Sequence, residues 1–144
     1  GAARAEVRGL LDRAAQAVDL SAAGRLVGLA GTITTVTAHA LGLTDFDAEA
    51  IDGAELSVET TLASCDAIVH STAAERESWG YLRPGRRDVI AAGALVWSEV
   101  IARVVAETAE RTGTTGRARP LTTTVTSLHD ILDGIALSLA EPAR

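Results

Sequence analysis

The sequence predicts an α/β fold that is rich in helices and has two or three strands. Two segments, residues 26–41 and residues 121–140, carry the pattern of a β-strand that leads straight into a capped helix. Between them, residues 89–110 place apolar side chains on two adjacent helical stripes, which is typical of a central helix. Strands this apolar are normally covered on both faces, and two or three of them make a thin sheet. We therefore expect part of the parent fold to lie outside these 144 residues.

Composition and charge exclude several classes of protein. All 13 basic residues are Arg, and the net charge of −6 argues against a general nucleic-acid-binding surface. The single Cys65 cannot form an internal disulfide, and its place on the apolar side of a predicted helix indicates a buried structural thiol. No apolar run is long enough to span a bilayer. We expect no nucleic-acid partner, no membrane contact and a cytoplasmic location.

The first strand follows an N-terminal helix and precedes a short one. Residues 2–18 have apolar side chains at helical spacing, with arginines on the solvent side. In residues 26–30 four apolar side chains surround Gly28, which is typical of a strand buried on both faces. Gly31 breaks this strand, and Thr32 is expected to be the N-cap of a helix over residues 33–41.

The middle of the chain is predicted to be helical apart from one loop. Residues 43–53 form an Asp-rich loop, and residues 54–56 a short edge strand. Ser57 is expected to cap a helix that buries Val58, Leu62, Cys65 and Val69. Thr72 and Glu75 have the spacing of a capping box, which begins a short helix that ends near Trp79.

The C-terminal half is organised around the long helix. Residues 80–87 form a turn, and Asp88 is expected to cap the helix over residues 89–110, where Glu99 and Arg103 are spaced as an ion pair. A polar loop, residues 111–120, precedes a strand over residues 121–126. Ser127 and Asp130 are spaced as a capping box for a last helix over residues 128–140. This helix is expected to present to the core Leu128, Ile131, Leu132, Ile135 and Leu139.

Two features point to phosphate binding. A buried strand that ends at Gly31 and turns into a helix leaves backbone N–H groups unpaired at the positive end of the helix dipole, where phosphate binds readily. The alternative is that Gly31 merely permits a tight turn. Arg83, Arg86 and Arg87 precede the long helix, and their guanidinium groups suit phosphate oxygens. The alternative is a solvated loop in which they pair with nearby glutamates.

No set of residues forms a complete active site. The three histidines are scattered and lack the spacing of metal ligands. Ser127, His129 and Asp130 are sequence neighbours, which do not assemble a catalytic triad. The acidic residues of the loop at 43–53 lack the glycine that a calcium loop requires at its turn. We therefore assign no catalytic residue and no metal ligand in this chain.

The order of the motifs resembles one family. GLAGTITTVTAHALGL, IDGAELS, TAAERESWGYLRPGRRDVIAAGALVW and VTSLHDILDGIAL follow one another as in the C-terminal part of the exopolyphosphatase/guanosine pentaphosphate phosphatase (Ppx/GppA) family. The resemblance implies the fold of the actin-like ATPase superfamily, two RNase H-like domains around a cleft. Residues 1–144 would form the C-terminal portion of the second domain, a partial RNase H-like domain. The small residues around Gly93 would pack against the other domain at a hinge.

The resemblance also implies an activity, the release of terminal phosphate from polyphosphate or of the 5′-phosphate from guanosine pentaphosphate. The family's two phosphate loops and catalytic glutamate are not in this sequence, so we expect the catalytic groups outside this chain. Mg²⁺ would serve the parent enzyme, whereas this chain alone would bind none and be inactive. The expected phosphate-binding residues are Gly31, Thr32, Thr34, Arg86 and Arg87.

The partners implied are one of these substrates, the missing first domain of the same protein and a second copy in a homodimer. An alternative from another class is a non-catalytic module that binds a phosphate, a nucleotide or a protein partner with the same fold. A sugar-kinase relative is a third alternative, and it would need a phosphate donor site and an acceptor pocket that the sequence does not display.

Overall fold

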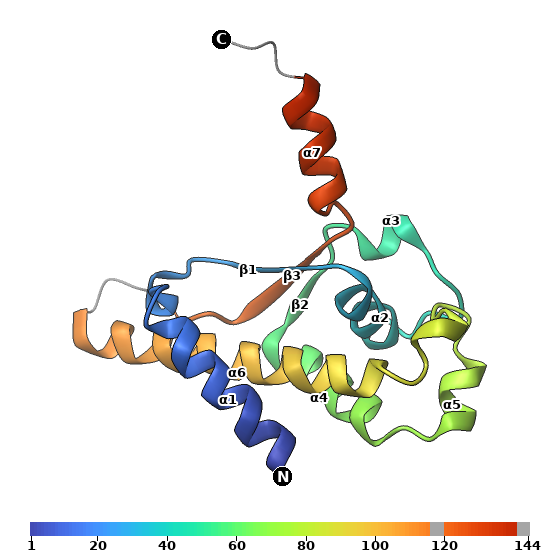
Figure 1. Ribbon diagram of the computed structural model, residues 1–144, viewed down its shortest axis with the longest axis horizontal. Helices are drawn as coiled ribbons and strands as arrows, with labels where there is room; N and C mark the ends of the chain where they lie inside the picture. The colour runs from blue at the N-terminus through green and yellow to red at the C-terminus, as the bar shows by residue number, and fades with distance from the viewer. Residues whose placement is uncertain (116–119, 141–144) are drawn as a thin grey trace.

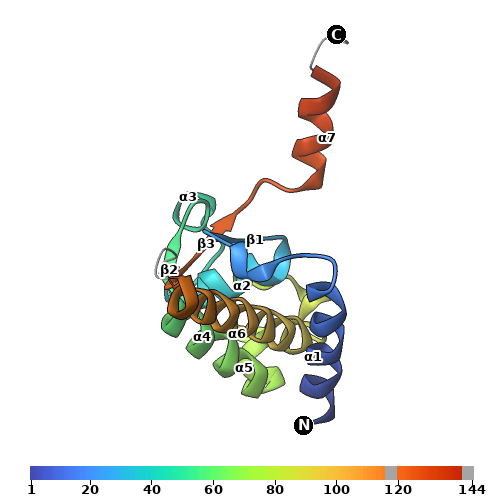
Figure 2. The same ribbon diagram turned by 90° about the vertical axis from the view of Figure 1, so that its left-hand side faces the viewer.

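A three-stranded sheet carries most of the helices on one face (Figures 1 and 2). The strands β1 (Leu26–Leu29), β3 (Thr123–Ser127) and β2 (Glu55–Ser57) lie in the order β1-β3-β2. β1 runs parallel to β3, with Gly28 beside Thr126, and β2 runs antiparallel to β3. The mixed sheet confirms the predicted α/β class and the short edge strand.

The computed structural model describes residues 1–115 and 120–140 of the chain. Helices α2 (Gly31–Ala40), α4 (Val58–His70) and α6 (Ile90–Thr115) form the main layer beside the sheet. The remaining elements in the described residues are α1 (Ala2–Ala15), the 3₁₀ turns η1 (Leu20–Ala22) and η2 (Pro84–Arg86), α3 (Ala48–Ile51), α5 (Ala73–Ser78) and α7 (Ile131–Ala140).

Helix α6 is central, as its two apolar stripes predict. It packs along α4 and also contacts α1 and α2. Its buried residues Ile90, Ala94 and Ile101 join the core, together with Val36 of α2 and Ile68 of α4. The helix begins at Ile90, one residue later than predicted, and continues to Thr115, so residues 111–115 of the predicted loop are helical. Residues 116–119 of that loop lie outside the described residues.

Hydroxyl groups join strand β3 to the helices below it. Thr126 and Thr37 of α2 share a hydrogen bond of 2.6 Å between their Oγ1 atoms. Thr124 and Thr61 of α4 share another, of 2.9 Å. All four side chains are buried, and each pair satisfies polar groups that would be costly to bury alone. The polar sequence of this strand therefore still faces a closed interior.

The helix caps of the middle of the chain are confirmed. The Ser57 hydroxyl accepts a hydrogen bond from the Thr60 N–H, and Thr72 and Glu75 form the capping box. Cys65 is buried as predicted, and burial raises the pKa of its thiol to about 12, so it stays protonated at neutral pH. No helix of the described residues is long and apolar enough to cross a membrane.

Two predicted helix starts are wrong. Helix α2 begins at Gly31, so Thr32 lies inside it, and the N-cap is Ala30, which has no side chain able to cap. The Ser127–Asp130 capping box does not form, because Ser127 belongs to β3. The same spacing recurs three residues later: the Asp130 carboxylate accepts from the Leu132 N–H, and the Asp133 carboxylate accepts from the Asp130 N–H. Helix α7 accordingly starts at Ile131.

The predicted apolar burial is wrong at both ends of the fold. Val27 and Leu29 of β1 are 46% and 48% exposed, so this strand is covered on one face only. Helix α7 does not face the core: it rises away from the body (Figure 1), and Ile131 and Leu139 are 75% and 82% exposed. Helix α1 ends at Ala15 rather than residue 18 and has no buried residue.

Helix α1 is held against α6 by charged groups instead. The Glu99 carboxylate, only 5% exposed, accepts hydrogen bonds of 2.6 Å from Arg4 and of 2.6 Å from Arg8. The predicted pair of Glu99 with Arg103 does not form, because Arg103 bonds Glu107 and Asp12 of α1. The hydrogen bond from Arg8, followed by the one from Arg4, lowers the pKa of Glu99 against the opposing effect of burial.

Replacing Glu99 with Gln is expected to lower the free energy of unfolding at neutral pH by about 1–3 kcal/mol, because two guanidinium groups lose their acceptor charge. Since the pKa of Glu99 is lower in the folded state, its stabilisation is present above the unfolded-state pKa, about 4.3, and is lost as the pH falls through the folded value. Urea unfolding at pH 7 and below pH 4 measures this difference.

The matched control is Glu6→Gln on α1, where the carboxylate is exposed. A Glu99→Gln variant as stable as this control at pH 7, or a difference that grows as the pH falls, would contradict the assigned role of the carboxylate.

Candidate functional site

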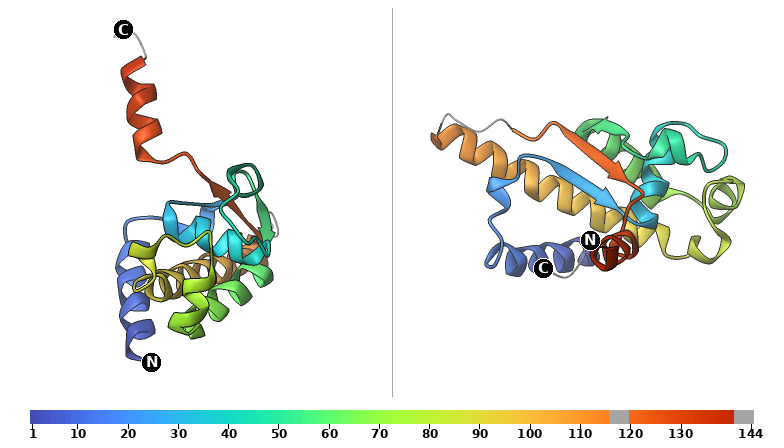
Figure 3. Two further views of the ribbon diagram at one scale, coloured as in Figure 1. Left: turned by 90° about the vertical axis from the view of Figure 1, so that its right-hand side faces the viewer. Right: turned by 90° about the horizontal axis from the view of Figure 1, so that it is seen from above.

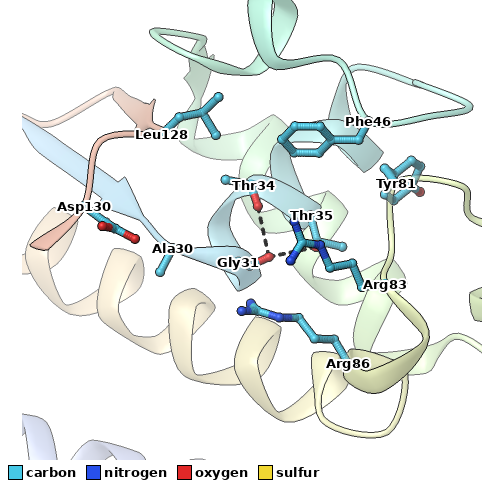
Figure 4. Close-up of a pocket in the computed structure, with 10 residues that line it drawn as sticks. All are labelled: Ala30, Gly31, Thr34, Thr35, Phe46, Tyr81, Arg83, Arg86, Leu128 and Asp130. Atoms are coloured by element: carbon cyan, nitrogen blue, oxygen red, sulfur yellow. Dashed lines mark hydrogen bonds between the residues drawn. The ribbon is translucent and has the colours of Figure 1, made fainter. Parts of the chain in front are cut away.

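A pocket of about 240 Å³ opens where β1 turns into α2 (Figure 4). Four of its lining residues belong to this corner, two arginines come from the turn before α6, and the others come from the loop after α2, the segment after α5 and the segment after β3. The lining residues are Ala30, Gly31, Thr34, Thr35, Phe46, Tyr81, Arg83, Arg86, Leu128 and Asp130.

The strand-to-helix corner leaves backbone N–H groups without an acceptor in the helix, and the first of them belongs to Gly31, which lines the pocket. Ala30 has φ 74°, a left-handed conformation that costs a residue with a Cβ about 1–3 kcal/mol, and it turns the chain sharply from β1 into α2. The helix has no side-chain N-cap, and the first N–H bonded back along it is that of Thr34, to the Ala30 carbonyl at 3.2 Å. The amides of residues 31–33 therefore have no acceptor within the helix, and the helix dipole favours an anion near them.

The threonine hydroxyls at the corner are already engaged with the backbone. Thr34 and Thr35 donate from Oγ1 to the Gly31 carbonyl, at 3.1 Å and 2.8 Å (Figure 4). These bonds brace the first turn of α2. Thr34 can still accept through its hydroxyl oxygen, but its only proton is committed.

Arg86 lies directly over Gly31. A Cβ atom built on Gly31 would come 1.4 Å from Arg86 Nη1, so only glycine leaves room for the guanidinium group at this place. Figure 4 shows Arg83 and Arg86 extending from the same turn toward the corner. Within the described part of the chain, neither guanidinium group makes an ion pair or a hydrogen bond. Both charges are thus available to a ligand.

The geometry of η2 explains which arginines meet. Arg83 is the N-cap of this 3₁₀ turn and Arg86 is its last residue, and both side chains line the pocket. Arg87, one residue further on, points elsewhere: its Nη2 donates to the Glu77 carbonyl at 3.4 Å, and its Nε is buried without a partner in the described residues. The predicted pairing of the arginines with glutamate carboxylates is not seen among them.

Of the five predicted phosphate-binding residues, Gly31, Thr34 and Arg86 line the pocket, whereas Thr32 and Arg87 do not. The Thr32 side chain packs on α6, where a Cβ on Gly93 would come 2.5 Å from Thr32 Oγ1. The close approach that Gly93 permits is thus made within this chain, and its role at an interdomain hinge stays a prediction.

Sequence reasoning assigned Gly31, Thr34 and Arg86 to the site and missed the other lining residues, four of which have charged or aromatic side chains. Arg83 was recognised only as part of the arginine group, although its spacing of three residues from Arg86 after Pro84-Gly85 is a signal for the 3₁₀ turn. Phe46, Tyr81 and Asp130 come from separate segments that only the tertiary fold brings together. No local pattern could have assigned them to this corner.

The described residues do not fit a metal ion. No group of three His, Cys, Asp or Glu side chains in them lies close enough to hold one. The expectation that Mg²⁺ serves the parent enzyme remains a prediction. What the pocket can do is bind an anion, through backbone N–H groups on one side and two guanidinium groups on the other.

Comparisons with known proteins show what the chain as a whole resembles. No family model matches the chain. Exopolyphosphatase 2 of Mycobacterium tuberculosis is 41% identical to it over 138 residues, which make up 96% of this chain and 40% of that protein. The crystal structure of an exopolyphosphatase-like protein matches with a TM-score of 0.87 and 39% identity, over 95% of this chain and 41% of that chain.

The resemblance to the Ppx/GppA family is confirmed. The Ppx/GppA phosphatase of Aquifex aeolicus, with a TM-score of 0.62 at 20% identity, supports the fold alone. The chain spans about two fifths of the length of the curated relatives it matches, so this Ppx/GppA-like fold is shared with only part of each relative.

The Gly31→Ala substitution is expected to displace Arg86 from the corner without unfolding the protein. The methyl group would meet the far end of a flexible side chain, and alanine is the better helix former. The affinity for tripolyphosphate should fall roughly tenfold, because about one charge-assisted hydrogen bond is lost. Calorimetric titration measures this affinity.

Gly24→Ala is the control, because a Cβ at that position meets nothing within 4 Å. Equal affinities of the two variants for tripolyphosphate would show that Arg86 does not contact the anion.

Proposed function

We propose that this chain forms a phosphate-binding wall of an exopolyphosphatase-like phosphohydrolase, which releases terminal phosphate from polyphosphate. The observation that carries the proposal is the position of Arg83 and Arg86, unpaired in the described residues, across from the open amides that begin at Gly31. The 41% identity to a protein named exopolyphosphatase 2 supports the same substrate class.

The pocket suits a chain of phosphates better than a single neutral ligand. Guanidinium forks bind phosphate oxygens in pairs, and helix N–H groups supply further donors without a counterion. Because the protein as a whole has a net charge of −6, this local group of cations also gives a polyanion one preferred place to bind. These groups bind and orient the phosphate chain.

The chemical step is assigned to the part of the parent protein outside this chain. There we expect the group that activates water and the Mg²⁺ that neutralises the phosphates, as the family resemblance implies. This chain alone is then a binding unit that does not turn over substrate. Its contribution to catalysis is to hold the polyanion in register with those groups.

Arg83→Ala and Arg86→Ala, made separately in the full-length protein, are each expected to raise KM for polyphosphate roughly tenfold, with a smaller effect on kcat, because each removes ground-state binding. Phosphate release over a range of polyphosphate concentrations measures both constants.

Arg13→Ala on α1 is the charge-matched control and should leave KM unchanged. Unaltered kinetics in both pocket variants would remove the arginines from the site. A full-length protein that binds polyphosphate at this pocket but releases no phosphate would support the non-catalytic module instead.

Guanosine pentaphosphate is a second candidate substrate, favoured by the other side of the pocket. Phe46, 53% exposed, offers aromatic surface for a base, and the Asp130 carboxylate can accept from the ring and amino N–H groups of guanine. Inorganic polyphosphate has no group that would use these side chains.

Phe46→Ala is therefore expected to raise KM for guanosine pentaphosphate several-fold and to leave KM for polyphosphate unchanged, because only the nucleotide loses a stacking partner worth about 1–3 kcal/mol. Parallel phosphate-release assays on the two substrates measure this. Equal changes on both substrates would mean that the base does not bind at Phe46.

A further inference from the structure

One face of the sheet has no cover in the described residues. Viewed from above, β1 and β3 lie open across the top of the helical layer (Figure 3, right). Val27 and Leu29 point away from the helices and are 46% and 48% exposed, whereas Gly28 between them is buried. A parallel strand pair is normally buried on both faces, so this apolar face is of the kind that a second layer covers.

Helix α7 adds a second apolar surface on the same side. Its residues Ile131, Leu132, Ile135 and Leu139 fall within about a third of the helix circumference and are 50–82% exposed. The helix rises from the end of β3 on the open side of the sheet (Figures 1 and 2). An isolated helix of ten residues is marginal in water, and this one needs a packing partner to be stable.

We propose that the open face of β1 and the apolar stripe of α7 form one docking surface, and that its occupant is the part of the same polypeptide that lies outside these 144 residues. The relatives supply the argument. The chain matches 40% of exopolyphosphatase 2 and 41% of the exopolyphosphatase-like structure, so three fifths of each relative's length lies outside the match.

The exopolyphosphatase-like structure also has the same arrangement of helices and strands as this chain. With a TM-score of 0.87 over 95% of this chain, the arrangement described here is the one that persists inside a longer chain. A permanently attached segment suits a surface this apolar, because a soluble monomer rarely leaves such surface uncovered. The segment that leads from β3 into α7 includes Leu128 and Asp130, which line the pocket, so the occupant of the docking surface would lie next to one wall of the phosphate site.

Thiol labelling of the full-length protein tests the proposal without any phosphate ligand. Leu29→Cys and Ile135→Cys place one thiol on each part of the docking surface, and Ala67→Cys places one on the exposed side of α4. In the native protein, we expect the thiols at positions 29 and 135 to react at least about tenfold more slowly than the thiol at position 67. In urea, which unfolds the protein, all three thiols should react at the same rate. Peptide mass mapping identifies the labelled site.

Two outcomes overturn the proposal. Thiols at positions 29 and 135 that react as fast as the one at 67 in the native protein would mean that the surface is open to solvent. Protection that disappears on dilution, together with a halving of the mass measured by light scattering, would assign the surface to a second copy. Because the readout is thiol protection, it is independent of whether the protein hydrolyses polyphosphate.

Discussion

The close packing of the β1–α2 corner against helix α6 is the constraint on which the rest of the structure depends. Gly28 and Gly93 permit it, because a Cβ on Gly28 would come 2.6 Å from Ile33 and 3.0 Å from Trp97, and one on Gly93 would come 2.5 Å from Thr32. With the two segments this close, the turn that begins α6 lies over the start of α2. The placement of Arg86 above Gly31 follows from that approach.

This packing also reconciles an unusual composition with a closed interior. Aromatic residues make up only 3% of the chain, so the core depends on Ile, Val, Leu and Ala and on small side chains that let elements approach one another. The two threonines of β3 that face the interior are hydrogen-bonded to threonines of α2 and α4, so their buried hydroxyl groups have partners. Trp97 of α6, a large side chain, is buried against Gly28.

Local physics made much of the fold predictable, and tertiary context decided the rest. The capping box at Thr72 and the cap at Ser57 are set by a few neighbouring residues and were predicted correctly. The start of α2 was not, because an unfavourable conformation at Ala30 replaces the side-chain cap that Thr32 would have supplied. The stripe on α7 was recognised as apolar, but a pattern on one helix does not tell which surface covers it.

The residues of the candidate site that could be predicted are those that a local sequence pattern identifies. Gly31 and Arg86 were identified from the chemistry of a strand-to-helix turn and of an arginine-rich loop. The choice of Arg83 over Arg87 depends on the 3₁₀ geometry between them, and Phe46 and Asp130 reach the pocket from distant segments.

The backbone conformation of Ala30 affects how rigid the proposed anion-binding corner is. Glycine would adopt φ 74° without strain, but it would also let the corner sample many other shapes. The exposed methyl group of Ala30 restricts that freedom but disfavours φ 74° as well, so the flanking elements, β1 paired with β3 and α2 packed on α6, have to hold this conformation. If the proposed anion binds at this corner, its hydrogen-bond donors are already aligned, and binding would cost little further chain entropy.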